Sequence, residues 1–191
     1  GGPGRFDADG VMDAGTDSVE IHCPPGTDVV VASRTGEVRC HGPLGRVFAS
    51  TRTGSVRIEA ATEVDVRSRT GSVDVGACAG RCAVVVATGK VQVDRAGAAE
   101  VCTSTGKITI DDAVDAVLST ATGSVHLGTH GAGTVRIRSV SGRVRVGLAP
   151  DANPETKLRS LTGRVRRRDA RDGALDGSVM VETVSGSIDI E

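Results

Sequence analysis

Residues 103–110 read Thr-Ser-Thr-Gly-Lys-Ile-Thr-Ile, and the architecture follows from this short motif. Ile108 and Ile110 alternate with polar residues after Gly106. An apolar residue at every second position is typical of a β-strand with one buried face. Glycine supplies a backbone bend that a β-carbon would hinder. The motif therefore predicts a short strand that begins directly after a corner.

The same pair of a hydroxyl residue and a glycine recurs along the chain at intervals of 17 to 23 residues. Thr16-Asp17 occupies the equivalent place 19 residues before the first of these glycines, with Asp in place of Gly. We call the stretch that carries one corner a unit, so the chain contains ten units. The corner glycines are Gly36, Gly54, Gly71, Gly89, Gly106, Gly123, Gly142, Gly163 and Gly186.

Each unit contains two short strands, which cannot bury an apolar face alone but can do so by stacking on similar units. The sequence therefore predicts an all-β fold, a right-handed parallel β-helix (β-solenoid) of about ten coils of 17–19 residues, with longer last coils. A β-sandwich would not keep one corner at constant phase, and a propeller needs longer units. We expect residues 1–15 to be an N-terminal tail or linker and residues 16–191 to be a single domain.

Composition restricts the function. Among 191 residues there are 26 Gly and 29 Val but no Trp or Tyr, so aromatic platforms for stacking bases or sugars are missing. The net charge of −1 argues against sequence-specific nucleic-acid binding. No apolar run is long enough to predict a transmembrane segment. We expect a cytoplasmic location, or the cell envelope or extracellular space if an upstream signal or anchor has been removed.

Residues that commonly carry chemistry do not converge in the predicted coils. The histidines at 22, 41, 126 and 130 are scattered, with His126 expected on a strand and His130 in a loop. Asp111 and Asp112 are adjacent and should point to opposite sides of a strand. We therefore predict no catalytic residues, no metal site and no cofactor, and we expect that the protein is not an enzyme.

Five cysteines are dispersed over different coils. Cys40 and Cys82 should point inward and Cys102 outward, whereas Cys23 and Cys78 fall in expected loops. Such a set is typical of buried thiols in a reducing compartment. A small disulfide between Cys78 and Cys82 is the alternative.

Charge is distributed unevenly. Residues 134–171 contain eleven basic and three acidic residues, whereas residues 1–28 contain one basic and six acidic residues. The basic region is either a solvated face that deters aggregation, a surface for an anionic polymer or lipid, or an end that contacts the acidic region of another copy. We define its arginine surface as Arg136, Arg138, Arg143, Arg145, Arg159, Arg164 and Arg166.

Three further expectations follow from the repeat. The residues one and three before each corner glycine, such as Thr103 and Thr105, should point inward and form hydroxyl ladders. The segment 147–155, with Pro150 and Pro154, should be a surface loop, because proline cannot donate to a strand ladder. The last strand, which ends near Ile190, should present an unpaired edge.

The repeated S/T-x-T-G-x-V-x-V unit resembles the bacterial adhesin-like family of unknown function over residues 17–191. Val19-Glu20-Ile21-His22-Cys23-Pro24-Pro25-Gly26-Thr27 resembles the strand and turn that precede the repeats in that family. The resemblance implies a β-solenoid and brings no catalytic residues with it. A second resemblance is to the bactofilins, cytoskeletal β-solenoids that polymerise end to end.

These observations favour a non-enzymatic structural or binding scaffold, adhesin-like, with a role in cell-envelope organisation or stress response. Its partner is then a protein or a cell-envelope polymer. The first alternative is a bactofilin-like filament former that associates through its ends. The second is an enzyme or lectin-like binder of polyanionic glycans.

Overall fold

The computed structural model describes residues 11–14, 18–130, 133–149, 152–167 and 177–191, and its regular structure is entirely β. The strand pairs between different elements are all parallel in the described residues. The same residues form no helix long and apolar enough to cross a membrane. The strands are β1 (Val11–Ala14), β2 (Val19–His22), β3 (Val29–His130), β4 (Gly133–Leu148), β5 (Glu155–Thr162), β6 (Val165–Arg166) and β7 (Gly177–Ile190).

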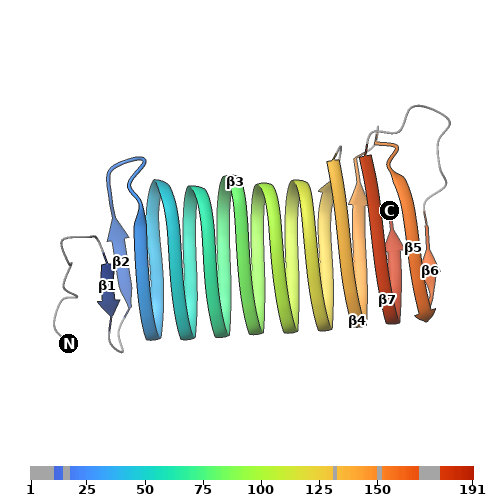
Figure 1. Ribbon diagram of the computed structural model, residues 1–191, viewed down its shortest axis with the longest axis horizontal. Coiled ribbons are helices and arrows are strands. Elements are labelled where there is room, and N and C mark those ends of the chain that lie inside the picture. The colour runs from blue at the N-terminus through green and yellow to red at the C-terminus, as the bar shows by residue number, and fades with distance from the viewer. Residues whose placement is uncertain (1–10, 15–17, 131–132, 150–151, 168–176) are drawn as a thin grey trace.

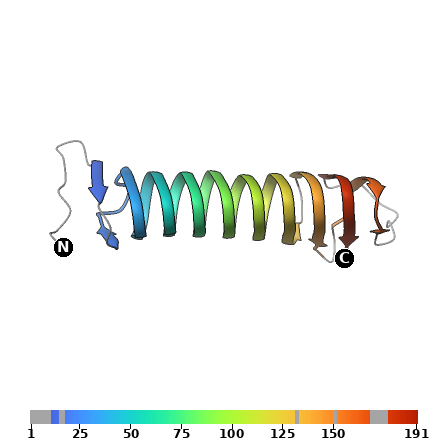
Figure 2. The same ribbon diagram turned by 90° about the horizontal axis from the view of Figure 1, so that it is seen from below.

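Strand β3 continues for 102 residues, and its ribbon winds repeatedly around the long axis of the molecule (Figure 1). Successive units lie against one another along that axis. Thr51 donates a hydrogen bond to Ser68 at 2.9 Å, and Thr103 donates one to Thr120 at 3.1 Å, each across 17 residues. The perpendicular view shows the same winding with a narrower profile (Figure 2).

The core lies inside this winding and has the predicted alternation. Ile108 and Ile110, two and four residues after their corner glycine, are fully buried, and the equivalent residues of most other units are buried as well. Ala113 and Ala116 are also buried, so the segment that leads to the next unit contributes to the core as well. The core is built mainly from Val, Ile, Leu and Ala, because these short side chains fit the narrow space between facing strands.

The predicted hydroxyl ladders are half right. The residue three before the corner is buried in most units, but the residue one before it, such as Thr105 or Thr122, is exposed. The reason is that the alternation changes phase at the corner, where two successive residues face outward. The buried hydroxyl residues of the ladder are Ser33, Thr51, Ser68, Thr103, Thr120, Ser139 and Thr183.

The order of the strands in space differs from their order in the chain. Strand β7 pairs with β4 on one side and with β5 and β6 on the other, so it lies between them. The expectation of an unpaired edge at the last strand was therefore wrong, since β5 and β6 form that end of the stack (Figure 1). Val179 and Val181 of β7 are fully buried, whereas the paired positions of β5 hold Thr156 and Leu158, a less apolar face that suits an end.

The other end of the stack is formed by β1 and β2, which both pair with β3. Strand β1 lies within residues 1–15, which we expected to be a tail or linker, and Val11 aligns with Val30 of β3. Residues 1–10 and 15–17 lie outside the described part of the chain. In the expected loop 147–155, Pro150 also lies outside it, whereas Pro154 is buried.

Candidate functional site

All seven members of the arginine surface are exposed and lie on β4, β5, β6 and the turn before β6. Parallel register aligns their positions in columns along the stack. Arg138 of β4 aligns with Glu182 of β7, which aligns in turn with Arg159 of β5. Arg145 aligns with Asp189, which aligns with Arg166.

The position of β7 changes the electrostatics of this surface. Its two acids, Glu182 and Asp189, each lie between two arginines, so the basic charge predicted for residues 134–171 is partly neutralised. Arg138 Nε lies 3.4 Å from Glu182 Oε2, and no other member of the arginine surface forms an ion pair with a described acid. Six of the seven guanidinium groups are therefore free of charged partners within the described residues.

The corner at Gly142 divides the arginine surface into two groups. Arg136 and Arg138 precede the corner, and Arg143 and Arg145 follow it. Val140 and the residue after it are both exposed, which shows that the chain turns between the two groups. The two groups thus occupy adjoining faces.

An exposed apolar stripe lies at this corner, and we did not predict it from the sequence. Val140, Val184 and Leu161 occupy neighbouring strands at equivalent positions and are 54%, 47% and 81% exposed. A shallow groove of about 360 Å³ is lined by Val140 and Val184 of the stripe, and by Arg138 and Glu182 among others. The sequence contained a signal for this stripe. The position two residues before the corner glycine holds arginine in three earlier units, at 34, 52 and 69, but an apolar residue in the three units of the stripe.

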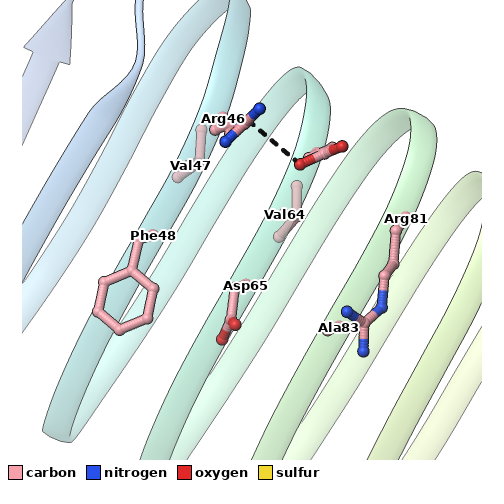
Figure 3. Close-up of a pocket in the computed structure, with 8 residues that line it drawn as sticks. Arg46, Val47, Phe48, Val64, Asp65, Arg81 and Ala83 are labelled. Carbon is pink, nitrogen blue, oxygen red and sulfur yellow. Dashed lines mark ion pairs between the residues drawn. The ribbon is translucent and has the colours of Figure 1, made fainter.

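In earlier units the exposed charges pair with one another more often. A groove of about 190 Å³ crosses successive units of β3 and is lined by Phe48 and charged side chains (Figure 3). Across the groove, Arg46 Nε lies 3.4 Å from Glu63 Oε2. Arg81 lies 2.6 Å from Glu100, which raises the pKa of this arginine. This groove therefore presents balanced charge rather than one sign.

The cysteines are free thiols at 23, 40, 78, 82 and 102. Cys40 and Cys82 are buried and Cys102 is exposed, as predicted, but Cys78 is buried in β3 rather than in a loop. Burial raises the pKa of Cys40 to about 11. A hydrogen bond between the two thiols lowers the pKa of Cys78 and raises that of Cys82.

Two other predicted placements need correction. His130 was expected in a loop, but it is fully buried in β3 with Nδ1 3.3 Å from the carbonyl oxygen of Ala113. It takes the inward position seven residues after its corner glycine, where other units hold Ala or Cys. Asp111 and Asp112 are both exposed rather than on opposite sides, because the chain turns after Ile110.

The structure also brings together two histidines that the sequence left scattered. His22 of β2 aligns with His41 of β3, and their rings are stacked with centroids 4.6 Å apart. Glu20 and Glu59 flank them. The signal for this cluster was their separation of 19 residues, the length of the first unit.

Comparison of the chain with protein-family models, with curated proteins and with solved structures finds no match in any of the three. The resemblance to the adhesin-like family therefore stays a prediction.

Proposed function

We propose that the chain is a right-handed parallel β-solenoid of about ten coils and that it works as a non-enzymatic binding scaffold. The parallel register of every described strand pair and the stacking of equivalent positions across about 17 residues support this architecture. A stack of this kind is stiff, because each unit is bonded to both neighbours. Such a scaffold presents side chains at fixed spacing rather than enclosing a substrate.

The proposed binding surface is the arginine surface, and its partner is an anionic polymer of the cell envelope or an acidic protein. The observation that carries the proposal is that six of its seven exposed arginines have no ion pair with a described acid. Guanidinium groups bind carboxylate and phosphate strongly through paired hydrogen bonds. An adhesin-like role in cell-envelope organisation or stress response fits such a surface.

Fluorescence anisotropy with labelled polyglutamate, a soluble polyanion, tests this proposal. We expect saturable binding that weakens with added salt and falls about tenfold or more in Arg145→Glu/Arg166→Glu. The matched control is Arg57→Glu/Arg81→Glu, which makes the same change in net charge at exposed arginines of earlier units that already pair with acids. Equal losses in both variants, or no binding by the unmodified protein, would contradict the proposal.

A second candidate function is end-to-end self-association, and the observation that favours it is the exposed end formed by β5 and β6. Among the described strands, β5 pairs only with β7, so its other edge is unpaired, and Leu161 adds exposed apolar area there. Three of the six acids in the region expected to meet this end, Asp7, Asp9 and Asp17, lie outside the described residues. Sedimentation velocity should show concentration-dependent growth that Leu161→Lys abolishes, and a monomer at all concentrations would contradict this candidate.

A further inference from the structure

Four side chains meet on the outer surface where β2 lies against β3. Glu20 Oε1 lies 3.0 Å from His41 Nε2 and 3.6 Å from His22 Nε2. On the opposite side of the His41 ring, Nδ1 lies 2.8 Å from Glu59 Oε1. The two imidazole rings are parallel to within 5°. The cluster therefore joins groups from both strands around one histidine.

Carboxylates lie against both ring nitrogens of His41, and the shorter contact, from Nδ1 to Glu59, favours the proton on Nδ1 in the neutral ring. Nδ1 donates to the carboxylate, which leaves the lone pair on Nε2. Glu59 is held in turn, because its other oxygen accepts the N–H of Gly42 at 3.0 Å. Nε2 is shielded from solvent and has no aligned hydrogen-bond partner, although Glu20 is close. A carboxylate behind one ring nitrogen and a free lone pair on the other is the arrangement of a metal-binding histidine.

The distances also suit an ion. Two ligand atoms bonded to a tetrahedral zinc ion lie about 3.4 Å apart. The separations of 3.0 and 3.6 Å from Glu20 to the two histidines bracket this value. The ligand atoms of all three residues lie within 4.8 Å of one another, and the side chain of His22 is 69% exposed. Two imidazoles with one carboxylate favour Zn²⁺ and similar ions over Mg²⁺ or Ca²⁺.

We propose that Glu20, His22 and His41 form a binding site for a divalent transition metal of the zinc class, with Glu59 orienting His41. This site is independent of the arginine surface, which lies at the other end of the stack. Bound metal would tie β2 to β3 and so stabilise the end of the stack that these strands form. The remaining coordination position is open to water or to a ligand of a partner.

The competing explanation is an ion-pair cluster without metal. The charged and titratable groups that face His41 are Glu20 and His22 from β2 and Glu59 from β3. The two carboxylates raise the pKa of His41, and the hydrogen bond that His41 donates to Glu59 contributes most. Protons therefore compete with metal, and zinc binding should weaken as the pH falls from 7.5 to 5.5.

Isothermal titration calorimetry of the reduced protein with ZnCl₂ at pH 7.5 separates these explanations. We expect one equivalent of zinc per chain, at least about tenfold weaker binding in His22→Ala, and about tenfold weaker binding in Glu59→Gln. His126→Ala is the matched control, since this exposed histidine lies several units away, and it should bind like the unmodified protein. His22 is itself exposed, so its removal should leave the circular dichroism spectrum unchanged.

Free thiols are the main source of false binding, and Cys23 and Cys102 are the accessible ones. The Cys23→Ser/Cys102→Ser variant should retain the site, and Co²⁺ bound to it should lack a thiolate charge-transfer band. No saturable binding, unchanged affinity in His22→Ala, or loss of binding in the double serine variant would each overturn the proposal.

Discussion

A methyl group at Gly106 would overlap the carbonyl oxygen of Gly89, because the two corner glycines lie directly against each other in successive units. Gly106 also has a φ of 153°, in a region that residues with a β-carbon rarely adopt. The same contact relates other corner glycines to their neighbours. The corner thus sets how closely the units stack, in addition to turning the chain.

Gly106→Ala should lower the free energy of unfolding by about 3 kcal/mol, the sum of backbone strain and displacement of the Gly89 carbonyl. Urea denaturation measures this loss. The matched control is Gly80→Ala, where φ is not positive and the nearest atom to the new β-carbon is the Thr62 oxygen at 3.0 Å. We expect that control to lose less than about 1 kcal/mol. Equal losses in the two variants would show that the backbone conformation and close contact at the corner add nothing to the cost of the substitution.

The part of the fold that could be predicted is the part that each unit encodes for itself. The burial of Ile108 and Ile110 follows from alternation within one strand, and the bend at Gly106 follows from its own lack of a side chain. Repetition strengthens the prediction, because the same local pattern recurs in each unit and so aligns with the pattern of the neighbouring units. Parallel pairing of successive units then needs no long-range information.

The order of the last strands could not be predicted, because it depends on a comparison between units. Gly163 and Gly186 mark two units with the same motif, and either one fits against β4 by its local pattern. The strand with the more apolar inward face takes the inner position. In β7 this face holds two fully buried valines, whereas the paired positions of β5 hold Thr156 and Leu158. The acids that β7 places among the arginines were missed for the same reason.

The histidine cluster was not predicted, because the histidines are scattered in the sequence and these two meet only through the register in which β2 pairs with β3. In a stack of units, residues one unit apart become neighbours, so His22 and His41 meet at a separation of 19 residues. Glu59 follows 18 residues later and completes the column.

The buried hydroxyl ladder leads to a prediction about polar pairs in the core. Thr103→Val should cost about 1 kcal/mol, because Thr120 loses its donor, which lies 3.1 Å away in a buried position. The double variant Thr103→Val/Thr120→Val should recover most of that loss, because neither of the two positions then holds an unpaired hydroxyl. Val86 already occupies this ladder position in the preceding unit. A double-mutant cycle from urea unfolding measures the coupling, and strictly additive losses would contradict it.

The His41–Glu59 pair should make stability depend on pH. The partners raise the pKa of His41, so its contribution is full below the unfolded value of 6.5 and is lost as the pH rises through the folded value. Hydrogen bonds from Gly42 and His41 lower the pKa of Glu59, so its contribution is full above 4.5 and is lost as the pH falls through the folded value. The pair therefore stabilises the folded protein most between pH 4.5 and pH 6.5.

Thermal melting in the presence of EDTA, from pH 5 to 8, tests this dependence. The difference in midpoint between the unmodified protein and His41→Gln should shrink as the pH rises. His126→Gln, which changes an exposed histidine away from the cluster, should give a difference that does not follow this trend. A His41→Gln difference that stays constant across the range would show that the pair does not titrate as described.

The thiols should react in an order set by burial. Cys102 is exposed and should react first with an aromatic disulfide reagent at pH 8. Cys40 is buried, and burial raises its pKa to about 11, so about one molecule in a thousand carries the reactive thiolate at that pH. Its modification should therefore wait for unfolding and accelerate with urea. Cys102→Ser should remove the fast phase and Cys40→Ser should leave it intact, whereas a fast phase that persists without Cys102 would mean that the core opens far more readily than its packing implies.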